Sequence, residues 1–184
     1  MLLPQEGAAS PRRNAVLGML HRCAAVSHRS QRNRTVPEIY VDADACPVKD
    51  EVLRVADRHG LSVHMVGNQW LRLADDPAVH MVLVPAEPDA ADDWIAAHVA
   101  PGDIVVTADI PLAARCLAAG AAAIGPTGRP FTDDNIGMAL AVRDLTAELR
   151  DAGTIGGGPA GFSARDRSQF LQALEAAVQR QSRR

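Results

Sequence analysis

The 184-residue sequence has few aromatic residues and almost no lysine. Aromatic residues make up 3% of the chain, so a hydrophobic core has to be built from Ala, Val, Leu and Ile, which is typical of buried parallel strands covered by helices. Lys49 is the single lysine. Its early position weighs against mechanisms that require a lysine late in the chain.

Long apolar runs and paired cysteines are also absent. No run approaches the roughly 18 to 20 residues that a membrane-spanning helix needs, so we expect a soluble protein with no membrane partner. Cys23, Cys46 and Cys116 lie far apart and show neither a CxxC motif nor the Cys/His spacing of a structural zinc site. Without disulfides, the expected compartment is the reducing cytoplasm.

The net charge of -3 conceals a difference between two parts of the chain. Residues 1–37 contain six Arg and one Glu, which leaves 13 basic and 21 acidic residues in the remainder, a net charge of -8. We predict a disordered Arg-rich extension over 1–37 and a single domain over 38–180. A transit peptide, a basic arm for nucleic acid and a start site assigned too far upstream are alternatives for the extension. The acidic domain favours a bound cation.

From residue 38 onward, short apolar segments alternate with helical patterns. We predict strands at 39–41, 62–66, 79–84, 104–107 and 122–124, and helices at 48–59, 90–99, 112–119, 132–151 and from Ser163. Repeated strand–helix units form parallel sheets. The sequence therefore predicts the α/β class, with three layers, α/β/α, in which the central layer is a mostly parallel sheet.

Two of the predicted strands end in aspartates that are followed by a proline. Asp42 and Asp44 follow the first strand, and because residues i and i+2 of an extended chain point to the same side, we expect them to converge. Asp109 follows the fourth strand in the same way. Parallel strands in α/β folds bind ligands beyond their carboxyl ends, so all three are candidate catalytic residues.

The prolines decide how these aspartates are interpreted. Proline suits the first helical position, so we place Pro47 and Pro111 at helix starts, downstream of the acids. Helix capping then accounts for none of the three aspartates, and loop solvation is the structural alternative for Asp109.

A third acidic group lies in the segment that begins the 90–99 helix. Asp89 and Asp92 fit an N-cap and its third-position partner, yet positions i and i+3 also share a helix face, so both could meet a cation. Converging carboxylates raise one another's pKa unless a cation neutralises them. Oxygen ligands favour Mg²⁺ or Mn²⁺, so the predicted metal ligands are Asp42, Asp44, Asp89, Asp92 and Asp109.

Such a metal site commonly hydrolyses phosphodiesters. A phosphatase of the haloacid-dehalogenase type, with Asp42 as nucleophile and Thr107 in its second motif, is an alternative, although the lysine that usually follows that motif is missing. A binding module that keeps the acidic pocket without turnover is another. Lys49, Asn68 and Thr107 are candidates for substrate contact, with solvation, turn formation and strand propensity as the respective structural explanations.

Several segments resemble the YaiI/YqxD family of uncharacterised bacterial proteins. They are VDADACPVKDE from Val41, VGNQ from Val66, PDAADDWI from Pro88 and GDIVVTADIPLA from Gly102, within a match over about 38–178. The resemblance implies a PIN-like fold with a nuclease site that gathers the five aspartates around a divalent metal. We expect RNA as the substrate, with DNA as the alternative. The chain departs from the family at Thr127 and Gly137, where arginines are common, so two phosphate contacts are missing.

Overall fold

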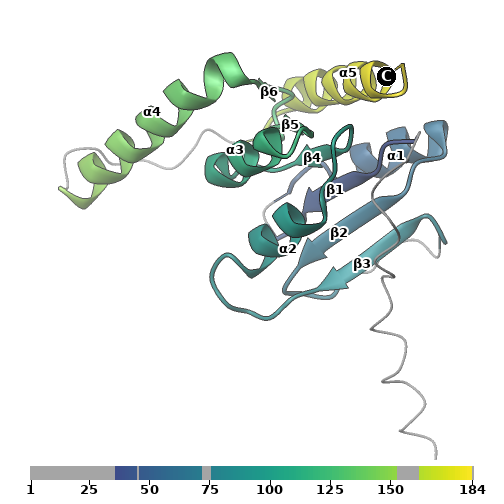
Figure 1. The fold of residues 1–184 in the computed structure, drawn as a ribbon, viewed down its shortest axis with the longest axis horizontal. Helices are drawn as coiled ribbons and strands as arrows, with labels where there is room; N and C mark the ends of the chain where they lie inside the picture. The colour runs from purple at the N-terminus through teal and green to yellow at the C-terminus, as the bar shows by residue number, and fades with distance from the viewer. Residues whose placement is uncertain (1–35, 45, 72–75, 153–161, 184) are drawn as a thin grey trace, which may run out of the picture. The chain divides into compact units, whose positions relative to one another are not determined.

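A computed structural model describes residues 36–44, 46–71, 76–152 and 162–183 of the chain. Its core is a six-stranded sheet in the order β3-β2-β1-β4-β5-β6 (Figure 1). The strands are β1 (Ile39–Asp42), β2 (Val63–Gly67), β3 (Val79–Leu83), β4 (Ile104–Val106), β5 (Ala122–Ile124) and β6 (Pro130–Phe131). The first five are parallel and β6 pairs antiparallel with β5. The expectation for the Arg-rich extension falls outside the described residues, apart from Val36 and Pro37.

The described helices are α1 (Lys49–His59), α2 (Ala90–His98), α3 (Ile110–Ala118), α4 (Asp133–Asp151) and α5 (Ala164–Gln181). α1 and α5 pack on one face of the sheet, and α2 and α3 pack on the other (Figure 1). The predicted three-layer α/β/α arrangement is therefore confirmed. Within the described ranges, no helix is both long enough and apolar enough to cross a bilayer.

Two hydrophobic cores follow from the alternation of side chains along the strands. Ile39 and Val41 of β1 face α1 and α5, where Phe170 is fully buried. Tyr40, between them, faces α2 and α3 together with Val105 of β4. Because the period is two, Asp42 continues the face of Tyr40 and points towards the α2 and α3 side at the end of its strand.

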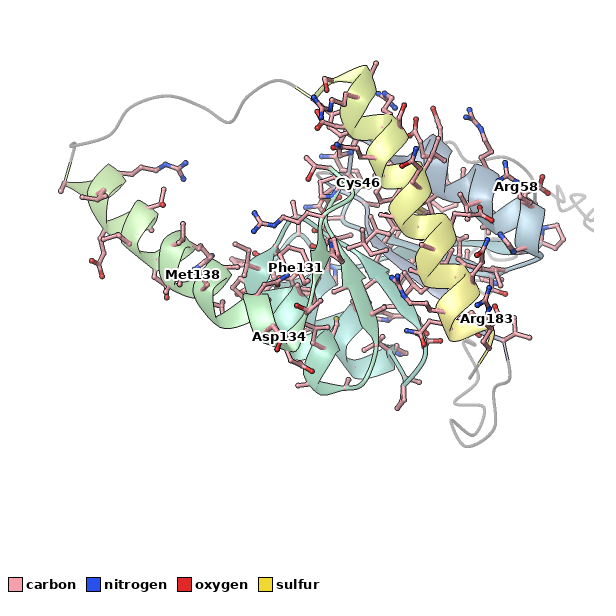
Figure 2. The ribbon with its side chains drawn as sticks, turned by 90° about the horizontal axis from the view of Figure 1, so that it is seen from above. Cys46, Arg58, Phe131, Asp134, Met138 and Arg183 are labelled. Atoms are coloured by element: carbon pink, nitrogen blue, oxygen red, sulfur yellow. The ribbon has the colours of Figure 1, made fainter. Side chains whose placement is uncertain are left out.

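α4 packs differently from the other helices. It begins with a capping box, in which the Thr132 backbone N–H donates to Asn135 Oδ1 at 3.0 Å. None of its described side chains is fully buried, and Met138, Val142 and Leu145 are exposed by 71%, 54% and 56%. Figures 1 and 2 show the helix extending beyond the edge of the sheet from its start beside α3. Packing therefore stabilises α4 less than it stabilises α1 or α5.

Candidate functional site

Asp42, at the end of β1, is joined to the end of β4 through Thr107. The buried Thr107 hydroxyl donates to Asp42 Oδ2 at 3.1 Å and accepts from the backbone N–H of Asp109 at 2.9 Å. β1 and β4 are adjacent and parallel, with Val41 level with Val106, so the same register continued by one residue sets Asp42 beside Thr107. A single side chain thus positions residues from both strand ends.

Asp109 is the N-cap of α3. Its Oδ1 accepts from the backbone N–H of Leu112 at 2.8 Å, and Pro111 lies inside the first turn, after Ile110. The prediction that capping does not account for Asp109 is wrong. Any of the first helical positions can accept proline because the backbone N–H groups there have no partner within the helix, so Pro111 does not mark the first residue of α3.

The prediction for Pro47 is also wrong, but here the helix begins after the proline and not before it. α1 begins at Lys49 with Val48 as its N-cap, so Pro47 precedes the helix instead of opening it. Neither Asp42 nor Asp44 is a cap of α1, in agreement with the sequence prediction. Lys49, a candidate substrate contact, is the half-buried first residue of the helix.

Asp44 turns towards β2. The backbone N–H of Asn68 lies 3.2 Å from both of its carboxylate oxygens, whereas Asp42 turns to β4. A Cβ on Gly67 would stand 2.5 Å from Asp44 Oδ1, so glycine leaves the space that this carboxylate occupies. The side chain of Asn68 is exposed, and it is the backbone of this residue that contacts Asp44. The role of Gly67 was not foreseen, although a glycine that ends a strand is a signal of close approach.

The first turn of α2 brings further acids to the same edge. Burial raises the pKa of Asp92 to about 6, helped by the charges of Asp109, Asp42 and Asp89. Burial also raises the pKa of Asp42, the Thr107 hydrogen bond opposes the shift, and the charges of Asp44 and Asp109 add to it. Aspartates from β1, α2 and the β4–α3 junction are therefore close enough to repel one another.

Asp89 and Arg115 flank this acidic group. Asp89 is the N-cap residue of α2, as the sequence suggests, but it has a left-handed backbone with φ of 61° and its side chain caps no N–H. Arg115 of α3 donates to Asp93 of α2 at 2.8 Å, which links the two helices on their exposed surface. Its charge lowers the pKa of Asp92, against the larger effect of burial and the three acids.

Comparison with known proteins places the chain in a family. The model of the uncharacterised YaiI/YqxD family matches residues 40–180. The chain belongs to the YaiI/YqxD family. It is 61% identical to a UPF0178 protein of Rhodospirillum rubrum over 143 residues, which span 77% of this chain and 95% of the relative. It is 64% identical to one of Parvibaculum lavamentivorans over 148 residues, or 80% of this chain and 97% of the relative. No solved structure matches the chain.

This YaiI/YqxD protein offers a donor set that fits a hard divalent cation. Its clustered groups are all carboxylates, and two of them have pKa values raised partly by their neighbours' charges, a repulsion that a cation would relieve. Within the described residues, no three His, Cys, Asp or Glu side chains already surround one metal position. Mg²⁺ is commonly held by one or two carboxylates and retains several waters, so the arrangement suits it better than a metal that needs a full protein shell.

Proposed function

We propose that the chain is a divalent-metal-dependent phosphodiesterase, a nuclease that acts on RNA. The observation that carries the proposal is the gathering of Asp42, Asp92 and Asp109 from three separate elements at the carboxyl edge of a parallel sheet, with the pKa of Asp92 raised to about 6. Structural stability does not require like charges to converge, because their repulsion destabilises the folded state. A bound cation would relieve this repulsion, which supports the proposal.

Each residue has a role in this proposal. Asp42 and Asp109 would be the principal Mg²⁺ or Mn²⁺ ligands, and Asp44, Asp89 and Asp92 would complete the shell or hold water. Thr107 fixes Asp42 through Oδ2, and the α3 cap fixes Asp109 through Oδ1. When bound, the metal supplies activation of water for attack at phosphorus and offsets the charge of the phosphoryl oxygens. Lys49 and Asn68 remain predicted substrate contacts.

Cleavage assays on the purified full chain test the proposal. Labelled single-stranded RNA and DNA are incubated with Mn²⁺ or Mg²⁺, or with chelator, using wild type, Asp42→Asn and the matched control Asp57→Asn, an exposed residue of α1. We expect RNA cleavage that needs metal, persists in Asp57→Asn and falls at least about 100-fold in Asp42→Asn, because a ligand should matter no less than the groups that orient ligands. The Asp42→Asn side chain keeps an oxygen that can accept from Thr107, so the fold should survive.

Binding provides a readout that does not depend on turnover. A ligand that binds only the folded state raises the melting temperature, so Mn²⁺ should stabilise wild type and Asp57→Asn but not Asp42→Asn. Equal cleavage by wild type and Asp42→Asn would defeat the nuclease proposal. Metal-dependent stabilisation without cleavage would favour the binding module, and an aspartyl-phosphate trapped on Asp42 would favour the phosphatase.

A further inference from the structure

A cavity of about 520 Å³ opens beside the acidic edge. Its walls come from the β4–α3 junction, the turn after β5, β6 and one face of α4. Ala108, which stands between Thr107 and Asp109, lines it. The cavity therefore begins at the same junction that carries Thr107 and the predicted metal ligand Asp109.

The charge of the cavity is opposite to that of the acidic edge. Three arginines line it, Arg129, Arg143 and Arg150, and its lining contains no Asp or Glu. Arg143 donates to Asp144 at 3.1 Å, but both side chains are about half exposed or more, and such surface pairs bind weakly. Among the described residues, no carboxylate forms an ion pair with Arg129 or Arg150. The charged side chains that line the cavity are therefore all positive, on a domain that is acidic as a whole, which suits an anion.

The apolar part of the lining supplies flat and flexible surfaces. Phe131 of β6 and Met138 of α4 both face the cavity, and Figure 2 shows Met138 on α4 and Phe131 at the edge of the sheet beside it. The ring of Phe131 packs over Gly125, where a Cβ would lie 3.7 Å from Phe131 Cε2. Nucleic-acid bases stack on such aromatic rings in a sequence-tolerant way. An inorganic anion would make no stacking or apolar contact with these side chains.

A tight turn fixes the position of Arg129. The Gly128 N–H donates to the Gly125 carbonyl at 2.9 Å, and the Gly125 N–H donates to the Arg129 carbonyl at 2.9 Å. Gly128 has φ of 81°, and a Cβ there would stand 2.5 Å from the backbone of Gln169 in α5. The turn is thus packed against α5, and Arg129 extends from a rigid support.

We propose that this cavity binds an unpaired nucleotide of single-stranded nucleic acid, with phosphates on the three arginines and a base against Phe131 and Met138. The inference rests on the proposed function, because Ala108 would place the strand beside Asp42 and Asp109. The volume lies in the range of pockets for one small ligand, which favours an unpaired base over a duplex whose bases are stacked inside. The cavity combines three arginines with an apolar wall formed in part by Phe131 and Met138.

The test measures binding without cleavage. Fluorescence anisotropy follows a labelled single-stranded RNA in chelator, over a series of salt concentrations, with the full chain. The Arg129→Gln/Arg150→Gln double variant should weaken binding and reduce the slope of log K against log salt by about 1.4, since each phosphate contact on a single strand contributes about 0.7. Met138→Ala and Phe131→Ala should weaken binding, with Phe131→Ala costing roughly 5-fold to 150-fold, and leave the slope unchanged. Arg58→Gln/Arg165→Gln, two exposed arginines outside the cavity, is the matched control and should bind as wild type does.

Several results would overturn the inference. One is that the cavity variant and the control variant reduce the slope of log K against log salt equally. Another is that duplex RNA binds as tightly as single-stranded RNA. A dimer in sedimentation that Met138→Asp dissociates would assign the surface to a second copy of the chain. Loss of binding in the cavity variant alongside a wild type that never cleaves would uphold the cavity and reject the nuclease. If the cavity variant cleaves and binds RNA as wild type does, the nuclease proposal is upheld and the cavity proposal is rejected.

Discussion

The β1–α1 and β4–α3 junctions both carry an Ala-Asp pair followed by a proline, yet their aspartates make different contacts. Asp109 caps α3 through Leu112, whereas Asp44 caps nothing and contacts the backbone N–H of Asn68. One residue separates Asp109 from Pro111, and two separate Asp44 from Pro47. α3 begins directly after Asp109, whereas α1 begins at Lys49, five residues after Asp44, which is exposed at the edge of the sheet.

The two junctions are nevertheless one unit, because Thr107 binds both. Its hydroxyl accepts from the Asp109 N–H and donates to Asp42. At the first junction Asp42, the last residue of β1, is held by Thr107, which follows the neighbouring strand β4. At the second, the acid is held by its own helix. A carboxylate can therefore be positioned by a tertiary contact, as Asp42 is, or by capping its own helix, as Asp109 is. Substitutions can measure the contribution of each.

Substitution of Asp109 should have the largest effect and should separate charge from capping. Asparagine caps helices about as well as aspartate, so Asp109→Asn should keep the stability of wild type but lose at least about 100-fold of metal-dependent RNA cleavage. Asp109→Ala loses the cap as well, which costs about 1 kcal/mol. Thermal unfolding and cleavage of labelled RNA measure the two effects. If Asp109→Asn cleaves as wild type does, Asp109 is a cap and nothing more.

Thr107→Val removes the link between the junctions while keeping the shape of the side chain. It leaves the Asp109 N–H without its acceptor and Asp42 without its donor, so we expect a loss of about 1–3 kcal/mol in urea unfolding. The pKa of Asp42 should rise further, because the hydrogen bond from Thr107 lowers it. Thr107→Ser restores the hydroxyl and is the control. A valine variant as stable as the serine variant would mean that the hydroxyl does not stabilise the junctions.

The charge of Asp92 should make stability depend on pH. Its pKa is raised to about 6 in the folded chain, so between about pH 4 and pH 6 the folded state binds more protons than the unfolded state and stability falls as pH rises. Asp92→Asn should be more stable than wild type at pH 7, by roughly 1 kcal/mol after allowance for solvent screening, and equal to it below about pH 4.

Melting temperatures from pH 4 to pH 8 check this expectation. Mn²⁺ at pH 7 should remove the same repulsion in wild type, so the gap to Asp92→Asn should narrow when metal is added. Asp93→Asn, whose carboxylate pairs with Arg115 on the surface, is the matched control and should not gain stability. A gap of equal size at every pH would show that the acids do not repel one another.

The fold was largely predictable because each element has its own period and end signals. β1 to β5 and the five described helices were expected within about two residues at most of their ends, including the Ser163 cap of α5. β6 was missed because a two-residue strand that contains Pro130 has neither a period nor a typical composition.

The site was predictable only in part. Strand ends predicted where Asp42, Asp44 and Asp109 would lie, but the direction in which Asp44 turns depends on Gly67 and Asn68, which come from another strand. The arginines of the cavity are spread from 129 to 150 and converge only through the packing of α4 beside α3. Arg143 and Arg150 are seven residues apart on α4 and so share a helix face, but no local spacing predicts that Arg129 lines the same cavity.

Gly67→Ala should give the smallest effect and tests whether Asp44 is held as loosely as its exposure suggests. The new Cβ would displace Asp44 Oδ1, and the loss of its contact with the Asn68 N–H should cost about 0.5–1 kcal/mol, because both groups regain water. Thr107 follows β4, on the other side of β1, so its hydrogen bond to Asp42 should be kept. Asp44→Ala removes the obstructing carboxylate, so in the double variant Gly67→Ala should cost less than it does alone, and a double-mutant cycle in urea measures the difference. Additive costs would mean that the two residues do not compete for the same space, and that Asp44 is positioned by its own loop alone.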